Sequence, residues 1–575
     1  MLENARIRLA GMEALLLLCF IALLVGLLSG SVIIFFRFLI EGVQSFIFPH
    51  GIPEKFDNLP LAVRILLPVC ASIGLYLVLT WVPAAYRATG IVHVIERFNF
   101  HQGYLSWRNA LTQFSGGLIA LIAGFSVGRE GPSVHLGAAC GSGLGQLLRL
   151  PNNSLRVLVA CGVSAGIAAS FYTPLAGVMF CIEVIMIEYS LNTLVPIVLS
   201  AVIGAVMTDV FFGDGTVFMV PHFLVQNFAI ELPIFILLGI TIGVLAKFFI
   251  IGLSWVTRIS STWPLFQRLF LAGSLTGLFG ALLPVILGSG YDSVNLMLVG
   301  EISLVLLLQI TLFKCIVSFT TVGLGVPAGI IGPLFMIGAA AGGAVGIIAS
   351  YFFEVNEISS IGLYAMLGMG AMMSATLQAP LAGLIALLEL TGNPNLILPE
   401  MLVIVIANLV VCSRPWKQQS VFMTLLQARG LNVRDDPIAQ ALRRVGVASV
   451  MERHIIKQPR YISFTEAQTC LQVMPIWIIV EEVFEEEICR NNLLLATDLA
   501  HFVATHPDVE TIDLLALPAK RLQLAPIALQ ATLQEASHAL QHQEAEALYI
   551  VRHEFSRREH IYGVVTQDKI QSVYQ

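Results

Sequence analysis

Long stretches without a charged residue recur along the first three quarters of the chain. One membrane-spanning helix needs about 20 mainly apolar residues. Eight uncharged stretches approach or exceed that length: Ala14–Phe36, Ile65–Tyr86, Asn109–Gly128, Val157–Ile182, Leu191–Thr208, Leu269–Tyr291, Cys315–Phe353 and Ile358–Leu388. This pattern predicts an all-α polytopic membrane protein. The stretch from Cys315 to Phe353 is too long for one helix and contains glycines and prolines, so we expect two broken helices there.

Composition agrees with this reading. Of the 575 residues, 57% are hydrophobic and 12% are charged, whereas soluble domains carry about 25% charged residues. The nine cysteines and twelve histidines are scattered without metal-ligand spacing, so we expect no metal site. The first apolar stretch is rich in glycine and lacks a cleavage signal, so we expect it to remain as a span.

Charged residues become frequent from about position 435, which predicts a membrane part and a tail. The predicted modules are a membrane body over 10–415, with halves at about 10–212 and 230–415, a last helix and linker over 416–445, and two tail modules over 446–506 and 512–575.

The tail contains two copies of one small α/β unit. Ser463-x-x-Glu466 and Thr532-x-x-Glu535 are capping-box signals that open short amphipathic helices. Each helix is followed by an apolar strand, Trp477–Val480 in one copy and Leu548–Val551 in the other. A second strand and a closing helix complete each predicted unit.

The membrane body also repeats itself. A segment that begins Tyr-Thr-Pro-Leu-Ala-Gly and ends at Glu183 returns as Gln-Ala-Pro-Leu-Ala-Gly ending at Glu389, an offset of 206 residues. A glycine-rich break precedes each copy, at Gly128–Pro132 and at Gly325–Pro333. Interrupted hydrophobic segments at corresponding positions of two halves predict a binding site near the midplane, between the halves.

The first break places two ionisable side chains, Arg129 and Glu130, inside an apolar region. Such a pair is costly at membrane depth, so it indicates a functional site. The flanking Gly128 and Gly131 allow the backbone to approach a ligand closely. Pro132 suits the first turn of a helix, whose free N–H groups attract anions. The break therefore predicts an anion site.

These motifs resemble those of the CLC family of chloride channels and anion/proton antiporters with a C-terminal pair of CBS modules. Ser133-Val134 after the first break, the two Pro-Leu-Ala-Gly segments and Gly325–Gly329 carry the resemblance. It implies an inverted-repeat membrane fold with a cytoplasmic α/β tail, assembled as a homodimer in the lipid bilayer. It also implies chloride or a similar small anion as substrate, no enzyme activity and no nucleic-acid partner.

The resemblance identifies Glu130 as the gating glutamate, whose carboxylate competes with anions for an outer site and takes part in proton transfer. The backbone amides of Gly128–Gly131 are expected to bind the anion there. Arg129 is expected to stabilise the local fold and to bias this site positive rather than to contact the anion directly.

A central anion site is implied at the second break. The amides of Ile330 and Ile331 are in place to hold the anion, and Thr89 retains the hydroxyl donor of the family's loop although Ala88 and Val92 replace a glycine and a proline. Phe422 stands where the family has a tyrosine and has no O–H group. A hydrogen bond to a charged group contributes about 1.5–3 kcal/mol, so we expect looser anion binding.

The departure with the largest consequence is Val184, which follows Glu183 where antiporters of the family commonly have a proton-relaying glutamate. Glu183 and Glu389 are interpreted as carboxylates that bond to backbone near the dimer interface. Because Val184 and Phe422 depart from the coupled pattern in the same direction, the sequence favours passive, channel-like conduction gated by Glu130, and the resemblance implies a voltage-gated channel. The alternative is an anion/proton antiporter.

Orientation and regulation rest on weaker patterns. Arg6 and Arg8 precede the first span, and basic residues follow the last (Arg414, Lys417, Arg429 and Arg434), which predicts cytoplasmic termini, in a bacterial inner membrane. Lys314 at the start of a span is expected to snorkel to the interface. In the CBS pair, Lys569 and Ala496 replace nucleotide-binding positions; this favours a structural tail over one that binds adenine nucleotide, and no other cofactor is expected.

A remote alternative is a CBS-linked divalent-cation transporter. Such a protein needs several convergent acidic ligands, and only Glu183 and Glu389 are candidates. An intramembrane enzyme lacks a nucleophile–base pair or metal constellation. Replacing Glu130 with Ala separates these readings, because an anion conductor loses pH sensitivity but still passes chloride, whereas a cation carrier is indifferent.

Overall fold

The computed structural model describes residues 15–48, 53–213, 218, 220–221, 223–353, 357–414, 417–432, 437–484, 488–507, 509–551 and 561–572. The chain forms two compact units. We call the first, Cys19–Gln146 with Arg156–Val433, the membrane body. The second, the tail unit, contains the described residues of 437–572 together with Leu15–Leu18 and Leu147–Leu155. Some sequence-based predictions lie outside the described residues. They concern Arg6, Arg8 and Arg434 and the predicted module bounds 10, 415, 416 and 575.

The described part of the chain before the tail forms helices joined by loops. Its helices are α2 (Leu15–Ile47), α3 (Leu61–Trp81), α4 (Gly90–Phe100), α5 (Trp107–Ile122), α6 (Glu130–Leu147), α7 (Asn152–Phe171), α8 (Pro174–Phe180), α9 (Leu191–Phe212), α10 (Phe228–Ser260), α11 (Leu265–Leu282), α12 (Tyr291–Val299), α13 (Leu304–Gly323), α14 (Ile331–Ser350), α15 (Ile361–Leu377), α16 (Pro380–Thr391), α17 (Ile397–Cys412) and α18 (Val421–Ala428). Short helical turns occur at Phe56–Asn58, Ala84–Tyr86, Cys181–Met186, Pro284–Ile286 and Pro394–Leu396.

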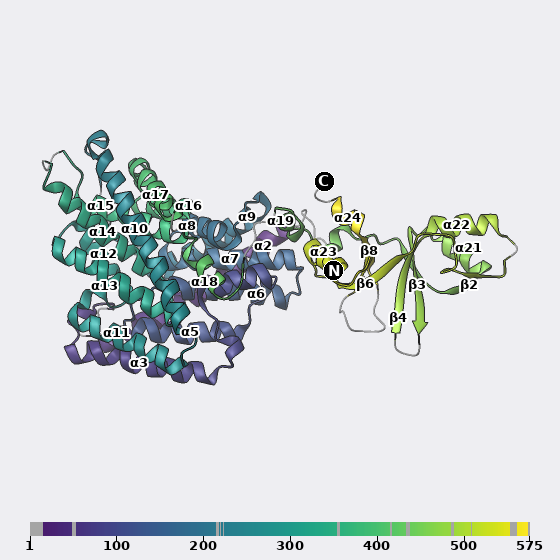
Figure 1. The fold of residues 1–575 in the computed structure, drawn as a ribbon, viewed down its shortest axis with the longest axis horizontal. Coiled ribbons are helices and arrows are strands. Elements are labelled where there is room, and N and C mark those ends of the chain that lie inside the picture. Colours follow the sequence, from purple (N-terminus) through teal and green to yellow (C-terminus); the bar gives the residue numbers. More distant parts are fainter. Residues whose placement is uncertain are drawn as a thin grey trace. The chain divides into compact units, whose positions relative to one another are not determined.

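Nine helices within the described part of the chain are long and apolar enough to cross a membrane. The predicted breaks are present. The stretch from Cys315 to Phe353 is divided between α13 and α14, with the glycine-rich segment between them. In the membrane body α14 packs along α15, and α3 packs along α11 (Figure 1).

Two carboxylates join the halves of the membrane body reciprocally. Glu183 accepts hydrogen bonds from the backbone N–H groups of Leu381 (3.1 Å) and Ala382 (2.7 Å) at the start of α16. Its repeat mate Glu389 accepts from two N–H groups at the start of α8, those of Leu175 and Ala176, both at 2.8 Å. The carboxylates and the N–H groups that they bond to are related by the same 206-residue offset. Both side chains therefore occupy helix N-termini, where free N–H groups favour negative charge, and the interpretation as backbone-bonding carboxylates is confirmed.

The tail unit is built on a six-stranded sheet in the order β1-β3-β4-β6-β7-β8. Its strands are β1 (Ile455–Pro459), β3 (Trp477–Phe484), β4 (Ile488–Leu495), β6 (Leu522–Ala528), β7 (Ala547–Val551) and β8 (Gly563–Thr566), and a separate pair joins β2 (Tyr461–Ser463) to β5 (Thr511–Asp513). Each half of the sheet has one parallel pair followed by one antiparallel pair. The repeated order agrees with two copies of one unit, as the sequence predicts.

The helices of the tail unit are α19 (Pro437–Arg443), α20 (Val447–Val450), α21 (Phe464–Gln472), α22 (Ala496–Thr505), α23 (Leu533–His542) and α24 (Gln567–Gln571). Both predicted capping boxes are formed. The side chains of Ser463 and Thr532 each accept a bond from the backbone three residues later, and the glutamates there bond back. The local sequence thus determined where α21 and α23 begin.

An ion pair supports the β2–β5 pair. The guanidinium of Arg460 donates to both carboxylate oxygens of Asp513 at 3.0–3.2 Å and to Glu482 at 2.5 Å. The hydrogen bond from Arg460 holds the pKa of Asp513 below its usual value. A carboxyl group with a lowered folded-state pKa contributes stability above its unfolded value, and this contribution is lost as the pH falls through the folded value.

We therefore expect Arg460→Met to speed amide hydrogen exchange in β2 and β5 at neutral pH. The difference from the unsubstituted chain should shrink as the pH falls below the ordinary aspartate value of about 4 and through the lowered pKa of Asp513, because this carboxyl group then becomes protonated in both proteins. Hydrogen-exchange mass spectrometry on the full chain measures this, with the exposed Arg453→Met as control. Equal exchange of Arg460→Met and Arg453→Met at neutral pH would contradict the prediction.

The reciprocal carboxylates generate a second prediction. Glu183→Ala leaves two N–H donors at the start of α16 without their acceptor, so we expect a loss of about 2 kcal/mol in the free energy of unfolding. Glu183→Gln keeps one acceptor and should lose about half as much. Urea unfolding in detergent, followed by tryptophan fluorescence, gives both values, with the exposed Glu301→Ala as control. Unchanged stability together with lost proton coupling would indicate a relay role for Glu183 instead.

Candidate anion site

The two glycine-rich breaks meet at one point. Gly128 donates its N–H to the carbonyl of Gly329, and Gly329 donates back to the carbonyl of Gly128, both at 2.8 Å. This antiparallel bridge places the start of α6 beside the start of α14. A Cβ atom at Gly131 would lie 2.7 Å from the backbone nitrogen of Gly329, so the approach requires glycine. The free N–H groups of two helix starts therefore converge, as an anion site needs.

Glu130 occupies the centre of this junction. Its side chain is fully buried, and its Oε1 accepts a hydrogen bond of 2.6 Å from the hydroxyl of Tyr291. Oε2 has no hydrogen-bond partner among the described residues. A Cβ atom would come within 1.9 Å of Oε2 at Gly128 and within 2.7 Å at Gly329. The carboxylate thus fills a space that only glycines leave open.

Arg129 ties the start of α6 to the end of α7. Its Nη2 donates to the carbonyl of Ser170 at 2.9 Å, and its guanidinium lies 5.1 Å from the ring centre of Tyr291 and 5.6 Å from that of Phe171. It lines a separate cavity of about 20 Å³, which has room for about one water molecule. These contacts agree with the predicted stabilising role.

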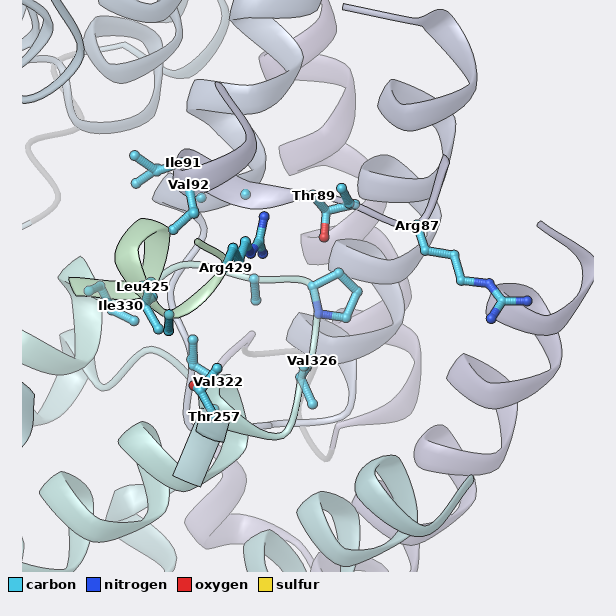
Figure 2. A pocket seen from close by; sticks show the side chains of 18 of the residues that line it. Arg87, Thr89, Ile91, Val92, Thr257, Val322, Val326, Ile330, Leu425 and Arg429 are labelled. Atoms are coloured by element: carbon cyan, nitrogen blue, oxygen red, sulfur yellow. The ribbon is translucent and has the colours of Figure 1, made fainter. Parts of the chain in front are cut away.

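A larger cavity of about 450 Å³ lies on the other side of the glycine bridge. Four of the predicted anion-site residues line it, namely Thr89, Gly131, Ile330 and Phe422, whereas Gly128, Arg129, Glu130 and Ile331 are not on its wall. Gly329 lines the cavity and also approaches the carboxylate of Glu130. The cavity wall therefore combines Gly131 of the predicted outer site with Thr89, Ile330 and Phe422 of the predicted central site. Figure 2 shows Thr89 and Ile330 on this wall.

The charge of this cavity was not predicted from the sequence. Its wall contains four arginines and, among the described lining residues, no aspartate or glutamate: Arg87, Arg258, Arg268 and Arg429. Arg429 is paired with Glu96 at 3.4 Å, and the Nε of Arg268 has no hydrogen-bond partner among the described residues. A cleft of one sign concentrates ions of the opposite sign. The sequence contained these arginines but no signal that they face one cavity.

The hydroxyl of Thr89 does not cap the helix that follows it. Thr89 precedes α4, yet its side chain makes no capping hydrogen bond. Instead the N–H of Gly90 donates to the Oε1 of Gln113 at 2.6 Å, and the Nε2 of Gln113 donates to the carbonyl of Pro327 at 2.9 Å. Gln113 therefore fastens the Thr89 loop to the second break. The loop is held there although Ala88 and Val92 depart from the family pattern.

Phe422 reaches the cavity from α18. Its side chain is buried, and the preceding Ser420 caps the helix by accepting from the N–H of Met423 at 3.3 Å. Phe422 therefore supplies volume but no hydrogen-bond donor on this side, as expected. Val184 is also buried and offers no titratable group.

The expectation for Lys314 is wrong. Its side chain is fully buried, and its Nζ donates to the carbonyls of Ile286 (2.9 Å) and Gly288 (2.6 Å). These carbonyls satisfy the ammonium group inside the protein, so it does not need to reach the interface. The loop that Lys314 holds leads into Tyr291, which the sequence analysis also missed. The signal was present in Gly288-Ser289-Gly290 at the end of an apolar stretch.

No group of three or more metal-ligating side chains occurs within the described ranges. The described histidines include one buried pair, in which the Nδ1 of His93 lies 2.9 Å from the Nε2 of His135. The Nε of Arg97 donates to the other nitrogen of His93 at 3.2 Å. An arginine donor beside a histidine disfavours metal binding, and this pair is structural.

Comparison with known proteins places these features in context. A family model described as voltage gated chloride channel matches residues 69–412. The H(+)/Cl(-) exchange transporter ClcA of Vibrio cholerae is 31% identical over 418 residues, which cover 71% of this chain and 88% of the relative. ClcA of Salmonella typhi is 30% identical over 413 residues, covering 69% and 85%.

Solved structures share the fold. A slow cyanobacterial Cl-/H+ antiporter has a TM-score of 0.62 and 23% identity and covers 72% of this chain and 97% of its own. A CLC-type fluoride/proton antiporter has a TM-score of 0.60 and 23% identity, and the match covers 72% of this chain and 98% of the antiporter. A eukaryotic CLC transporter has a TM-score of 0.60 and 17% identity, and the match covers 97% of this chain and 99% of the transporter. This likeness therefore includes the tail.

The cradle around Glu130 yields a prediction. In Gly128→Ala the new Cβ atom would overlap the carboxylate, whose Oε2 lies 1.9 Å from that position. We expect the carboxylate to be displaced, so that chloride flux at neutral pH rises severalfold and its pH dependence weakens. Flux assays in liposomes at several pH values measure both effects.

The matched control is Gly143→Ala. Gly143 lies on the same helix, α6, and has no heavy atom within 4 Å of the added Cβ position. Both variants add one methyl group, but only one of them adds it beside the carboxylate. If the two variants had the same flux and pH response, Glu130 would not depend on the glycine cradle.

Proposed function

Because the chain belongs to the voltage gated chloride channel (CLC) family, whose members are membrane transporters and channels rather than enzymes, we propose that this CLC-type anion transport protein exchanges chloride for protons. The sequence favoured passive conduction and kept exchange as the alternative. That preference is revised, because the relatives named above are H(+)/Cl(-) exchange transporters. The voltage-gated assignment gains no support from these relatives.

The observation that carries the proposal is the position of the Glu130 carboxylate. It lies at the junction of two helix starts, fully buried and hydrogen-bonded to Tyr291. A carboxylate in such a place imitates a bound anion. Protonation removes the negative charge of the carboxylate, and with it the attraction to the N–H groups of the two helix starts. Exchange requires at least one side chain with two states. In one state it is ionised and blocks the anion path, and in the other it is protonated and has moved out of the path.

Anions reach this junction through the arginine-lined cavity. The hydroxyl of Thr89 and the amides at Ile330 and Ile331 are the proposed ligands of the central anion, with Gly128–Gly131 at the outer site. Phe422 offers no donor, so the central site depends on the remaining groups and on the positive wall. The same wall disfavours the divalent-cation alternative, because four arginines repel a cation.

Protons need a route to Glu130 from the cavity side, and Val184 cannot provide it. The cavity volume of about 450 Å³ accommodates several water molecules. Gly329 is a common neighbour of the cavity and of the Glu130 carboxylate. We propose that water in this cavity carries the proton to the glycine bridge and that Glu130 accepts it there.

Several expectations remain predictions. These are the homodimer, the cytoplasmic location of both termini, the bacterial inner membrane, the structural role of the CBS-like tail rather than adenine-nucleotide binding, and the module boundaries. Chloride as the transported anion is proposed from the relatives' names. Chloride, bromide, nitrate and fluoride are compared directly in the same assay as below.

The test is the reversal potential of the purified protein in liposomes, first with a chloride gradient at equal pH and then with an added pH gradient. Exchange predicts that the pH gradient shifts the reversal potential, because protons move with each cycle. In Glu130→Ala we expect chloride transport to continue while the shift disappears, since the proton acceptor is missing.

Each other outcome has a definite meaning. A reversal potential at the chloride value that ignores pH would restore the passive channel and the original reading of Val184. A shift that persists in Glu130→Ala would place the proton acceptor elsewhere. Absence of any chloride-dependent potential would overturn the proposed substrate. Glu301→Ala, an exposed change in the membrane body, controls for reconstitution.

A further inference from the structure

Tyr291 is a buried residue at the gate for which the anion pathway described above has no role. It is the first residue of α12, and its hydroxyl donates to the Oε1 of Glu130 at 2.6 Å. Because an ionised carboxylate only accepts hydrogen bonds, the phenol must be the donor. Its O–H group therefore points at the place that the gating carboxylate fills.

The backbone before Tyr291 is firmly held. Lys314 donates to the carbonyls of Ile286 and Gly288, and the N–H of Gly288 donates to the carbonyl of Gly124 at 2.9 Å. Gly290 has a φ of +87°, which glycine adopts without strain. A buried lysine and two glycines thus fix the direction in which α12 begins.

The ring of Tyr291 is held as well. It packs edge-on against Phe218 (ring centres 5.4 Å apart) and Phe171 (6.2 Å), and the guanidinium of Arg129 lies over it. Phe335 contacts both phenylalanines. Because contacts hold both the ring and the backbone before it, we expect the donor to stay in place when its acceptor moves.

We propose that Tyr291 is a ligand of the transported anion. When Glu130 leaves the site, the O–H group of Tyr291 donates its hydrogen bond to a small monovalent anion instead of to the Glu130 carboxylate. This inference rests on the proposed function and extends it. A buried donor without an acceptor is costly, so departure of the carboxylate favours entry of another acceptor of the same charge. Chloride, bromide and nitrate all satisfy this requirement.

The neighbouring atoms fit such an exchange. A Cβ atom at Gly332 would lie 3.2 Å from the Tyr291 hydroxyl oxygen and 3.1 Å from the Oε1 of Glu130. The start of α14 is therefore close to both groups, and its backbone N–H groups are available to the same anion. Since Phe422 brings no hydroxyl to the central site, Tyr291 gives this chain a phenol donor at the outer site instead.

The first experiment measures chloride affinity with the gate removed. In the Glu130→Ala protein, isothermal titration calorimetry with chloride is compared with and without Tyr291→Phe. We expect the added substitution to weaken chloride binding roughly 10- to 100-fold, as the loss of a hydrogen bond to a charged group predicts. Phenylalanine keeps the ring contacts, so the fold should be retained.

The matched control is Tyr364→Phe in the same background. Tyr364 is also buried and also donates its hydroxyl to a glutamate, at 2.5 Å, but that acceptor is the Oε2 of Glu231 and not the carboxylate of Glu130. We expect its loss to leave chloride affinity unchanged within about twofold. If Tyr291→Phe had no larger effect than this control, the ligand role of Tyr291 would be wrong.

A second readout uses the intact gate. With Glu130 present, Tyr291→Phe removes the donor that holds the carboxylate, so we expect faster chloride flux in liposomes and fewer protons exchanged per chloride. Tyr364→Phe should change neither quantity. A merely structural residue would lower total activity without altering this ratio, and an unaltered ratio would count against the proposal.

Two further outcomes are distinguished. If Glu130→Ala alone binds no chloride, the proposed function fails, and the ligand role fails with it. If Tyr291→Phe does not yield folded protein, chloride is titrated into Glu130→Ala while near-ultraviolet tyrosine absorption is recorded. A phenol that binds the anion shifts this absorption with the same chloride dependence as binding, and the absence of a shift overturns the proposal.

Discussion

Two backbone hydrogen bonds between Gly128 and Gly329 are the constraint on which the rest of the site depends. They join one break from each half of the membrane body, so that two helix starts meet at one point. Neither break alone forms a site, because one helix start offers only part of an anion's surroundings. The carboxylate of Glu130, the proposed anion ligands at the two helix starts and the end of the arginine-lined cavity all lie beside this bridge. Glycine is required because the backbones approach too closely for a side chain.

The carboxylates of the membrane body show how one chemical group serves two purposes. Glu183 and Glu389 each bond to two backbone N–H groups and hold the halves together. Glu130 also lies at helix starts, but its Oε2 has no hydrogen-bond partner among the described residues, and its strongest contact is a side-chain hydroxyl. A carboxylate with two backbone donors is fixed, whereas one that shares a single phenol can be displaced. The number and kind of donors thus separate the structural groups from the proposed gate.

Positive charge is arranged along the pathway in two ways. Arg129 lies near the gate but is used to tie α6 to α7 through Ser170. The arginines of the larger cavity come from the segments before α4, at the end of α10, in α11 and after α18. They attract anions as a group, without one of them forming a dedicated site. Val184 and Phe422 remove a relay and a donor, and water and Tyr291 are the groups that the geometry offers in their place.

The sequence by itself determined the helical membrane body, the internal repeat, the two breaks and the starts of α21 and α23. These follow from local rules: uncharged length, glycine and proline positions, and capping boxes. It also identified Glu130, because an ionisable pair among apolar residues is conspicuous. Only the tertiary structure decided that Gly128 bonds to Gly329, that Lys314 is buried, that Tyr291 donates to Glu130 and that four arginines share a cavity. Those facts depend on contacts between residues far apart in the chain, and periodicity along one segment carries no information about its partner in another.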